Sequence, residues 1–171
     1  EKVNKNENLS DILLNYGLDY AQIFNIARTS KGIFDVRKFR VNNSYTMFCK
    51  PDSSEKLQIM IYEIDNTDYL VIDLRDSLLI TRERKEIRTE RKTSSGIIES
   101  SLYQTLVDNK INQVVAIDLA AIFAWEIDFY HLQKGDKFKV IYNEQFVEDK
   151  SIGIKDIEAA YFYHYNNDYY G

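Results

Sequence analysis

The sequence predicts an α+β fold of two small units, each a helix pair followed by antiparallel strands. Apolar residues recur at helical spacing early in each half of the chain, and short alternating or β-branched runs follow them. Turn-forming residues separate these runs. A length of 171 residues suits one domain or two small ones. We therefore expect units at residues 1–84 and 93–171, with residues 85–92 as a charged connector or a shared strand.

The first unit begins with two predicted helices. The first has apolar residues at the i, i+3, i+4 and i+7 positions of one helical face: Leu9, Ile12, Leu13 and Tyr16. Asn8 or Ser10 can cap its start, and Gly17 fits the position just past its end. Asp19 and Gln22 have the spacing of a capping box for the second helix. The expected apolar face of that helix comprises Ile23, Phe24 and Ala27.

Short strands in hairpin succession are expected after these helices. The runs are rich in branched and aromatic residues, and turn chemistry at Pro51–Ser54 and Asp65–Asp68 separates them. The runs are Tyr45–Cys49, Leu57–Ile64, Tyr69–Ile72 and Leu78–Ile80.

The second unit is expected to open with a loop at Ser94–Gly96. Helical spacing predicts one helix within Ile97–Asn109 and another over Val114–Phe129. The latter is apolar on most of its faces, so we expect it to be a central, buried helix. The alternating runs after it predict strands at Phe138–Tyr142, Ile157–Tyr165 and Asp168–Tyr170.

Charge and hydropathy disfavour several classes of protein. The formal net charge is −5, whereas a nucleic-acid binder usually has a basic excess, so no nucleic-acid partner is expected. No apolar run approaches the ~20 residues of a membrane-spanning helix. The single cysteine, Cys49, cannot form an intramolecular disulfide, and within a strand it is expected to be a buried, unreactive thiol.

The sequence predicts no catalytic residue and no metal site. The two histidines are His131, three residues after Asp128, and His164, which we expect at a surface or interface. A catalytic zinc needs three protein ligands, and neither H-E-x-x-H nor H-x-H occurs in the chain. Nucleophile-elbow and phosphate-binding glycine motifs are absent as well. Two carboxylates brought together by folding would still allow a stand-alone glycosidase, which remains an alternative.

Several segments of the first unit fit one known module: Asn8–Leu13, Tyr16–Leu18, Ile23, and Val41–Asn43 before the run Ser44–Phe48. Together they resemble a LysM-like unit, which recognises glycans that contain N-acetylglucosamine, such as peptidoglycan. The resemblance implies glycan contacts at Asn8, Leu9, Asn42 and Asn43.

Later segments keep a common order and spacing: Gly96–Tyr103, Ala124–Phe129, Lys134–Tyr142 and Ile157–Phe162. They resemble the region that precedes the catalytic domain in Gram-negative lysostaphin-type (LytM-like) peptidoglycan metalloendopeptidases. With the LysM-like part, the resemblance covers residues 3–171. Of the zinc motifs of that family, H-x-H is absent here, and the one H-x(3)-D match, from His164 to Asp168, has no H-x-H with which to complete a zinc site. The resemblance therefore implies that zinc and catalysis belong to a C-terminal domain missing from this chain.

This resemblance implies a non-catalytic region that positions substrate for a cell-wall zinc endopeptidase or covers its active site. The implied partners are peptidoglycan and the protein's own C-terminal peptidase domain, and no cofactor is expected in this chain. The implied location is the periplasm or cell envelope, which leaves room for a membrane anchor upstream of Glu1. A peptidoglycan-binding module without an inhibitory role is the first alternative.

Overall fold

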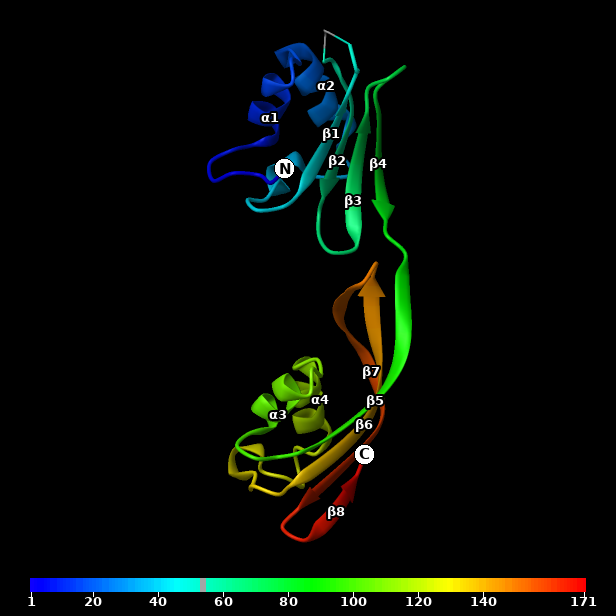
Figure 1. The fold of residues 1–171 in the computed structure, drawn as a ribbon. Coiled ribbons are helices and arrows are strands. Elements are labelled where there is room, and N and C mark those ends of the chain that lie inside the picture. Colours follow the sequence, from blue (N-terminus) through cyan, green and yellow to red (C-terminus); the bar gives the residue numbers. More distant parts are fainter. Residues whose placement is uncertain (53–54) are drawn as a thin grey trace. The chain divides into compact units, whose positions relative to one another are not determined.

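The protein is described by a computed structural model that covers residues 1–52 and 55–171. The chain divides into unit 1, Glu1–Glu86, and unit 2, Ile87–Gly171. Each unit has helices against one face of a four-stranded antiparallel sheet (Figure 1). The predicted α+β class and the presence of two units are confirmed.

The helices and strands of unit 1 are α1 (Leu9–Asn15), α2 (Tyr20–Thr29), the 3-10 helix η1 (Val36–Lys38), β1 (Tyr45–Cys49), β2 (Leu57–Glu63), β3 (Asp68–Asp73) and β4 (Leu79–Arg84). Those of unit 2 are β5 (Ile87–Ile97), α3 (Leu102–Asp108), α4 (Val114–Ile122), the 3-10 helix η2 (Phe129–His131), β6 (Lys137–Val147), β7 (Lys150–His164) and β8 (Asn167–Tyr170).

Local signals determine where the helices of unit 1 begin and end. Asn8 and Asp11 form a capping box at the start of α1, and Asp19 and Gln22 form another at the start of α2. Gly17 follows α1 with a φ of +80°, a conformation that glycine adopts without steric penalty. Of the two caps predicted for α1, Asn8 is the one found, and the predicted capping box of α2 and the predicted stop at Gly17 are confirmed.

The sheet of unit 1 is a simple meander, in which β1, β2, β3 and β4 pair in sequence order. The predicted hairpin succession is confirmed, although the predicted turn at Pro51–Ser54 lies partly outside the described residues. β4 continues to Arg84, beyond the predicted end at Ile80, and Asp68 pairs with this extension. Cys49 is exposed, so its predicted burial is wrong; it ends β1, a strand at the sheet edge, at a register irregularity.

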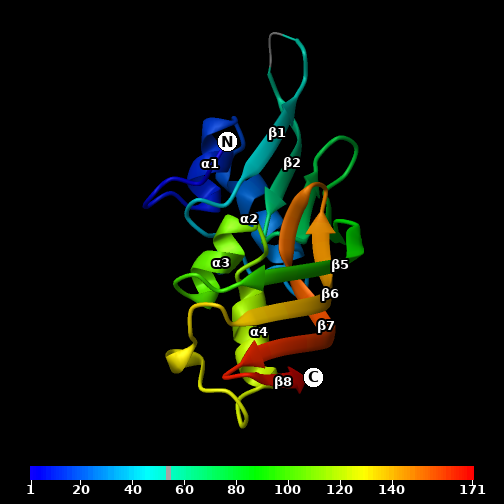
Figure 2. The same cartoon turned by 60° about the horizontal axis from the view of Figure 1, so that its bottom comes forward.

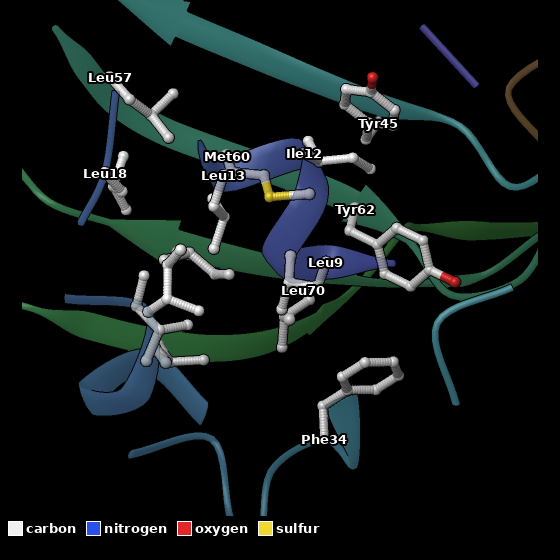
Figure 3. Packing of buried hydrophobic residues seen from close by; sticks show 14 of the residues in the cluster. Leu9, Ile12, Leu13, Leu18, Phe34, Tyr45, Leu57, Met60, Tyr62 and Leu70 are labelled. Carbon is white, nitrogen blue, oxygen red and sulfur yellow. The ribbon is translucent and has the colours of Figure 1, made fainter. Parts of the chain in front are cut away.

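The core of unit 1 lies between its helices and its sheet. Ile12 of α1, Met60 of β2 and Leu70 of β3 belong to this one buried cluster (Figure 3). Phe24 is predicted on the apolar face of α2, and this prediction is wrong, because its side chain is 69% exposed. Ile26 is buried in its place.

Unit 2 has the strand order β5-β6-β7-β8, and its helices lie between β5 and β6 in sequence (Figure 2). β5 therefore precedes the helix pair, which differs from the predicted order of helices followed by strands. The expected loop at Ser94–Gly96 is wrong, since these residues belong to β5. A Cβ on Gly96 would lie 2.7 Å from side-chain carbons of both Phe138 and Thr105. The glycine thus permits close packing rather than a turn.

The charged segment 85–92 contains the link after β4 and the first half of β5. Its charges pair across the new sheet: Arg91 with Glu158 and Lys92 with Glu144, both at 2.8 Å. Such cross-strand pairs allow a run of charged residues to form a strand.

α4 is shorter and less buried than its sequence predicts. It ends at Ile122, and only Val115 and Leu119 of its residues are fully buried. Ile117 is 69% exposed, and Trp125, beyond the helix, is fully exposed. The expectation of a central buried helix is wrong because the helix packs on one face of a single sheet, which covers only one of its sides. None of the helices in the described part of the chain is long and apolar enough to span a membrane.

Candidate functional site

The candidate functional site is a cavity of about 1050 Å³ in unit 1. Its first wall is formed by the end of α2 and by the segment that continues through η1 to Arg40. Its second wall is formed by Ile64 and Asp65, between β2 and β3, and by Arg82 of β4. Both apolar and charged side chains line it.

Local hydrogen bonds shape the first wall. The carbonyl of Ser30, at the end of α2, accepts the backbone N–H groups of Ile33 and Phe34 at 2.9 Å each. The chain therefore turns as soon as the helix ends. Asp35 then begins η1 by accepting the backbone N–H of Arg37 at 3.0 Å. This compact turn places its basic side chains around one opening.

Asn43 and Tyr62 tie the two walls together. Nδ2 of Asn43 lies 3.0 Å from the Tyr62 hydroxyl and 2.9 and 3.0 Å from the carbonyl oxygens of Glu63 and Ile64. The Tyr62 hydroxyl also accepts the backbone N–H of Arg40 at 2.8 Å. Arg40 and Ile64 belong to opposite walls, so this half-buried network connects the two walls.

The cavity has a strong excess of positive charge. Six cationic side chains line it, Arg28, Lys31, Arg37, Lys38, Arg40 and Arg82, together with two carboxylates, Asp35 and Asp65. The side chain of Arg37 lowers the pKa of Asp35, and the backbone N–H groups of Asp68 and Thr67 lower that of Asp65. A glycosidase acid needs a raised pKa. These two carboxylates therefore do not suit the glycosidase alternative.

The four residues for which glycan contacts are implied all have structural roles in unit 1. Asn8 caps α1, and Leu9 is buried in the core of unit 1. Asn42 has a φ of +69° just before β1, and Asn43 ties the cavity walls together. The structure describes all four, and they lie outside the lining of the cavity. Glycan contact at these residues stays a prediction.

The basic wall corresponds to a local excess of basic residues in the sequence that was not among the predicted sites. Residues 28–40 hold five basic residues and one acidic residue. The net charge of −5 conceals this local excess. The most conspicuous charged run, residues 82–92, instead forms strands and cross-strand ion pairs.

Both histidines of unit 2 pair with an aspartate. Nδ1 of His131 lies 2.7 Å from the Asp128 carboxylate at the surface, and Nδ1 of His164 lies 2.7 Å from that of Asp136 in the interior. The expected surface position of His164 is wrong, because its place in β7 turns the ring to the same buried side as Phe162. Within residues 1–52 and 55–171, no three His, Cys, Asp or Glu side chains are grouped to hold a metal ion.

The chain is similar in sequence to a peptidoglycan peptidase. Over 81 residues it is 33% identical to the peptidoglycan DD-endopeptidase ShyC of Vibrio cholerae, a match that covers 47% of this chain and 19% of the relative. Over this stretch the chain is homologous to that endopeptidase. No family model matches the chain.

The fold is also found in solved structures. Helicobacter pylori Csd3 matches with a TM-score of 0.65 and 17% identity, over 99% of this chain and 47% of Csd3. A zinc-containing peptidase from Vibrio cholerae matches with a TM-score of 0.64 and 16% identity, over 99% of this chain and 52% of the peptidase. The chain thus spans about a fifth of its curated relative and about half of these solved chains.

Proposed function

We propose that this chain is the non-catalytic regulatory and substrate-positioning region of a cell-wall zinc endopeptidase. The observation that carries the proposal is its 33% identity over 81 residues to a peptidoglycan DD-endopeptidase. A hydrolase needs a nucleophile, a base and an electrostatic clamp placed together. The cavity instead offers cations beside two carboxylates with lowered pKa, an arrangement suited to binding rather than to bond cleavage.

The proposal includes a division of labour. Unit 1, as a LysM-like domain, and unit 2 hold peptidoglycan or cover the active site, while a C-terminal peptidase domain carries the zinc and breaks the bond. Peptidoglycan and that domain are then the partners, and the periplasm or cell envelope is the location. A membrane anchor before Glu1 is compatible with this location.

The positioning role is tested with the purified chain and peptidoglycan sacculi. We expect the chain to co-sediment with sacculi while releasing no soluble muropeptides, measured by chromatography of the supernatant. Failure to co-sediment would remove the positioning role, and unaided release of muropeptides would contradict the non-catalytic assignment.

The regulatory role is tested by comparing one zinc endopeptidase domain alone with the same domain fused after Gly171. We expect the fusion to digest sacculi more slowly, at equal zinc content, because the added region covers the active site. A proteolytic cut introduced after Gly171 should restore the rate. If the fusion binds sacculi and digests them at the rate of the free domain, the alternative of a binding module without inhibition is correct.

A further inference from the structure

The cavity of unit 1 has a charge opposite to that of the protein around it. Its lining carries six cations and two carboxylates, an excess of four positive charges, whereas the whole chain has a net charge of −5. A local cluster of cations produces a positive electrostatic potential even in an acidic protein. This potential attracts anions to the cavity.

Several of these cations are not neutralised by the protein. Arg37 is held by Asp35, and Arg82 by Asp68. Lys31, Lys38 and Arg40 are exposed, and none of them forms an ion pair within the part of the chain that the structure describes. They come from the turn after α2, from η1 and from the segment that follows it, so their charges are spread along the wall rather than focused on one point.

The cavity also provides apolar contact area. Phe24, whose side chain is 69% exposed, lies at its lining, as do Ile33 and Ile64. Phe34 also belongs to the lining; it is buried, and its ring lies 5.6 Å from that of Tyr62. A ligand that fits this cavity therefore combines separated negative charges with aliphatic groups, which is the chemistry of an acidic peptide.

We propose that this cavity binds an acidic peptide through its carboxylates, with Lys31, Lys38 and Arg40 as the recognising cations. The cavity already contains one contact between an arginine and a carboxylate. Arg37 donates to the Asp35 carboxylate from Nε at 3.0 Å and from a terminal nitrogen at 2.9 Å. Resting on the proposed function, the ligand is the stem peptide of peptidoglycan, a short peptide with free carboxylates and aliphatic side chains.

The test compares two fluorescent stem peptides by polarisation: one with free carboxylates and one with the same carboxylates amidated. The whole chain is titrated against each. We expect the Kd to rise about tenfold or more on amidation. The triple variant Lys31→Gln/Lys38→Gln/Arg40→Gln should lose binding to the same degree. High salt should weaken binding of the free-carboxylate peptide, because these charges are exposed to screening.

A matched control has the same change in net charge away from the cavity. The variant Lys2→Gln/Lys5→Gln/Lys50→Gln changes three exposed lysines of unit 1 that lie outside the cavity lining. It should bind within about twofold of the unchanged chain, because none of these three lysines lines the cavity. Circular dichroism melting of both variants shows whether either effect comes from misfolding.

Several outcomes would overturn the inference. Equal affinity for the amidated peptide would remove carboxylate recognition, and equal loss in both triple variants would remove the cavity as its place. Binding to inorganic polyphosphate but not to the peptide would assign the cavity to another class of anion. These results are separable from the proposed function, because sacculus co-sedimentation and slower digestion by the fusion are measured independently and do not require this cavity.

Discussion

Asn43 shows how much a single side chain contributes to the shape of the cavity. Its amide nitrogen lies within 3.0 Å of three oxygens on β2 and just beyond it. We expect Asn43→Ala to lower the free energy of unfolding by about 1–3 kcal/mol, because the half-buried carbonyl oxygens of Glu63 and Ile64 lose the hydrogen bonds from Asn43. Urea denaturation followed by circular dichroism measures this.

The control for Asn43 is an asparagine in a simpler environment. Asn25 is exposed on α2, and its side chain accepts one hydrogen bond, from Arg28. Asn25→Ala should stay within about 0.5 kcal/mol of the unchanged chain. Equal effects of the two substitutions would show that the Asn43 network does not stabilise unit 1.

Gly96 is required by packing rather than by backbone conformation. An added Cβ would lie 2.7 Å from Phe138 Cε1 and from Thr105 Cγ2. We expect Gly96→Ala to destabilise unit 2 by about 1–3 kcal/mol through overpacking. Ser95→Ala, next to it on the exposed side of β5, serves as the control. A Gly96→Ala protein as stable as the control would mean that Phe138 moves aside without penalty.

At the scale of elements, Asp68 of β3 joins the β3–β4 hairpin through ion pairs with two arginines of β4. It faces Arg84 in register, and its carboxylate is held by Arg84, with Nε at 2.7 Å, and by Arg82. These two side chains hold the pKa of Asp68 far below its ordinary value of 3.8. The folded state therefore binds the proton more weakly than the unfolded chain does. Asp68 thus stabilises unit 1 fully above about pH 4, and this contribution is lost as pH falls below it.

Asp68→Asn should remove this pH dependence. We expect the variant to be less stable than the unchanged chain at pH 7, and the difference to shrink steadily between about pH 4 and pH 2. Thermal melts over this range measure both proteins. Asp76→Asn, an exposed position in the turn before β4, is the control. A stability difference that does not change with pH would show that the charge of the Asp68 carboxylate is not the source of the stabilisation.

The elements also show what a sequence can predict. The helices of unit 1 are predictable because their capping boxes and Gly17 act within a few residues. The β5 strand and the exposed face of α4 are not, because both depend on partners far along the chain. Gly96 looks like a turn until Phe138 is placed beside it, and the apolar sequence of α4 does not show how many of its faces a single sheet covers.

At the scale of the whole molecule, net charge is a poor guide to local function. A total of −5 disfavours polyanion binding, yet unit 1 gathers six cations around one cavity. The basic residues between Arg28 and Arg40 are visible in the sequence. That the fold places them around the same cavity as Arg82 is not visible there. Hydrogen bonds of Tyr62 and Asn43 help to bring these segments to one opening.

The two units have separate cores, and this predicts separate stabilities. Leu13 is completely buried in the core of unit 1 and Leu106 in that of unit 2, and the two buried clusters share no residue. Leu13→Ala should lower the stability of unit 1 by about 2–5 kcal/mol, the usual effect of a cavity left by a buried leucine. Native-state hydrogen exchange with mass spectrometry then reports faster exchange in peptides from β2 and β3, with β6 unchanged.

Leu106→Ala is the matched control variant in the other core, and it should accelerate exchange only in unit 2. If either substitution accelerates exchange in both units equally, the two cores unfold as one cooperative body.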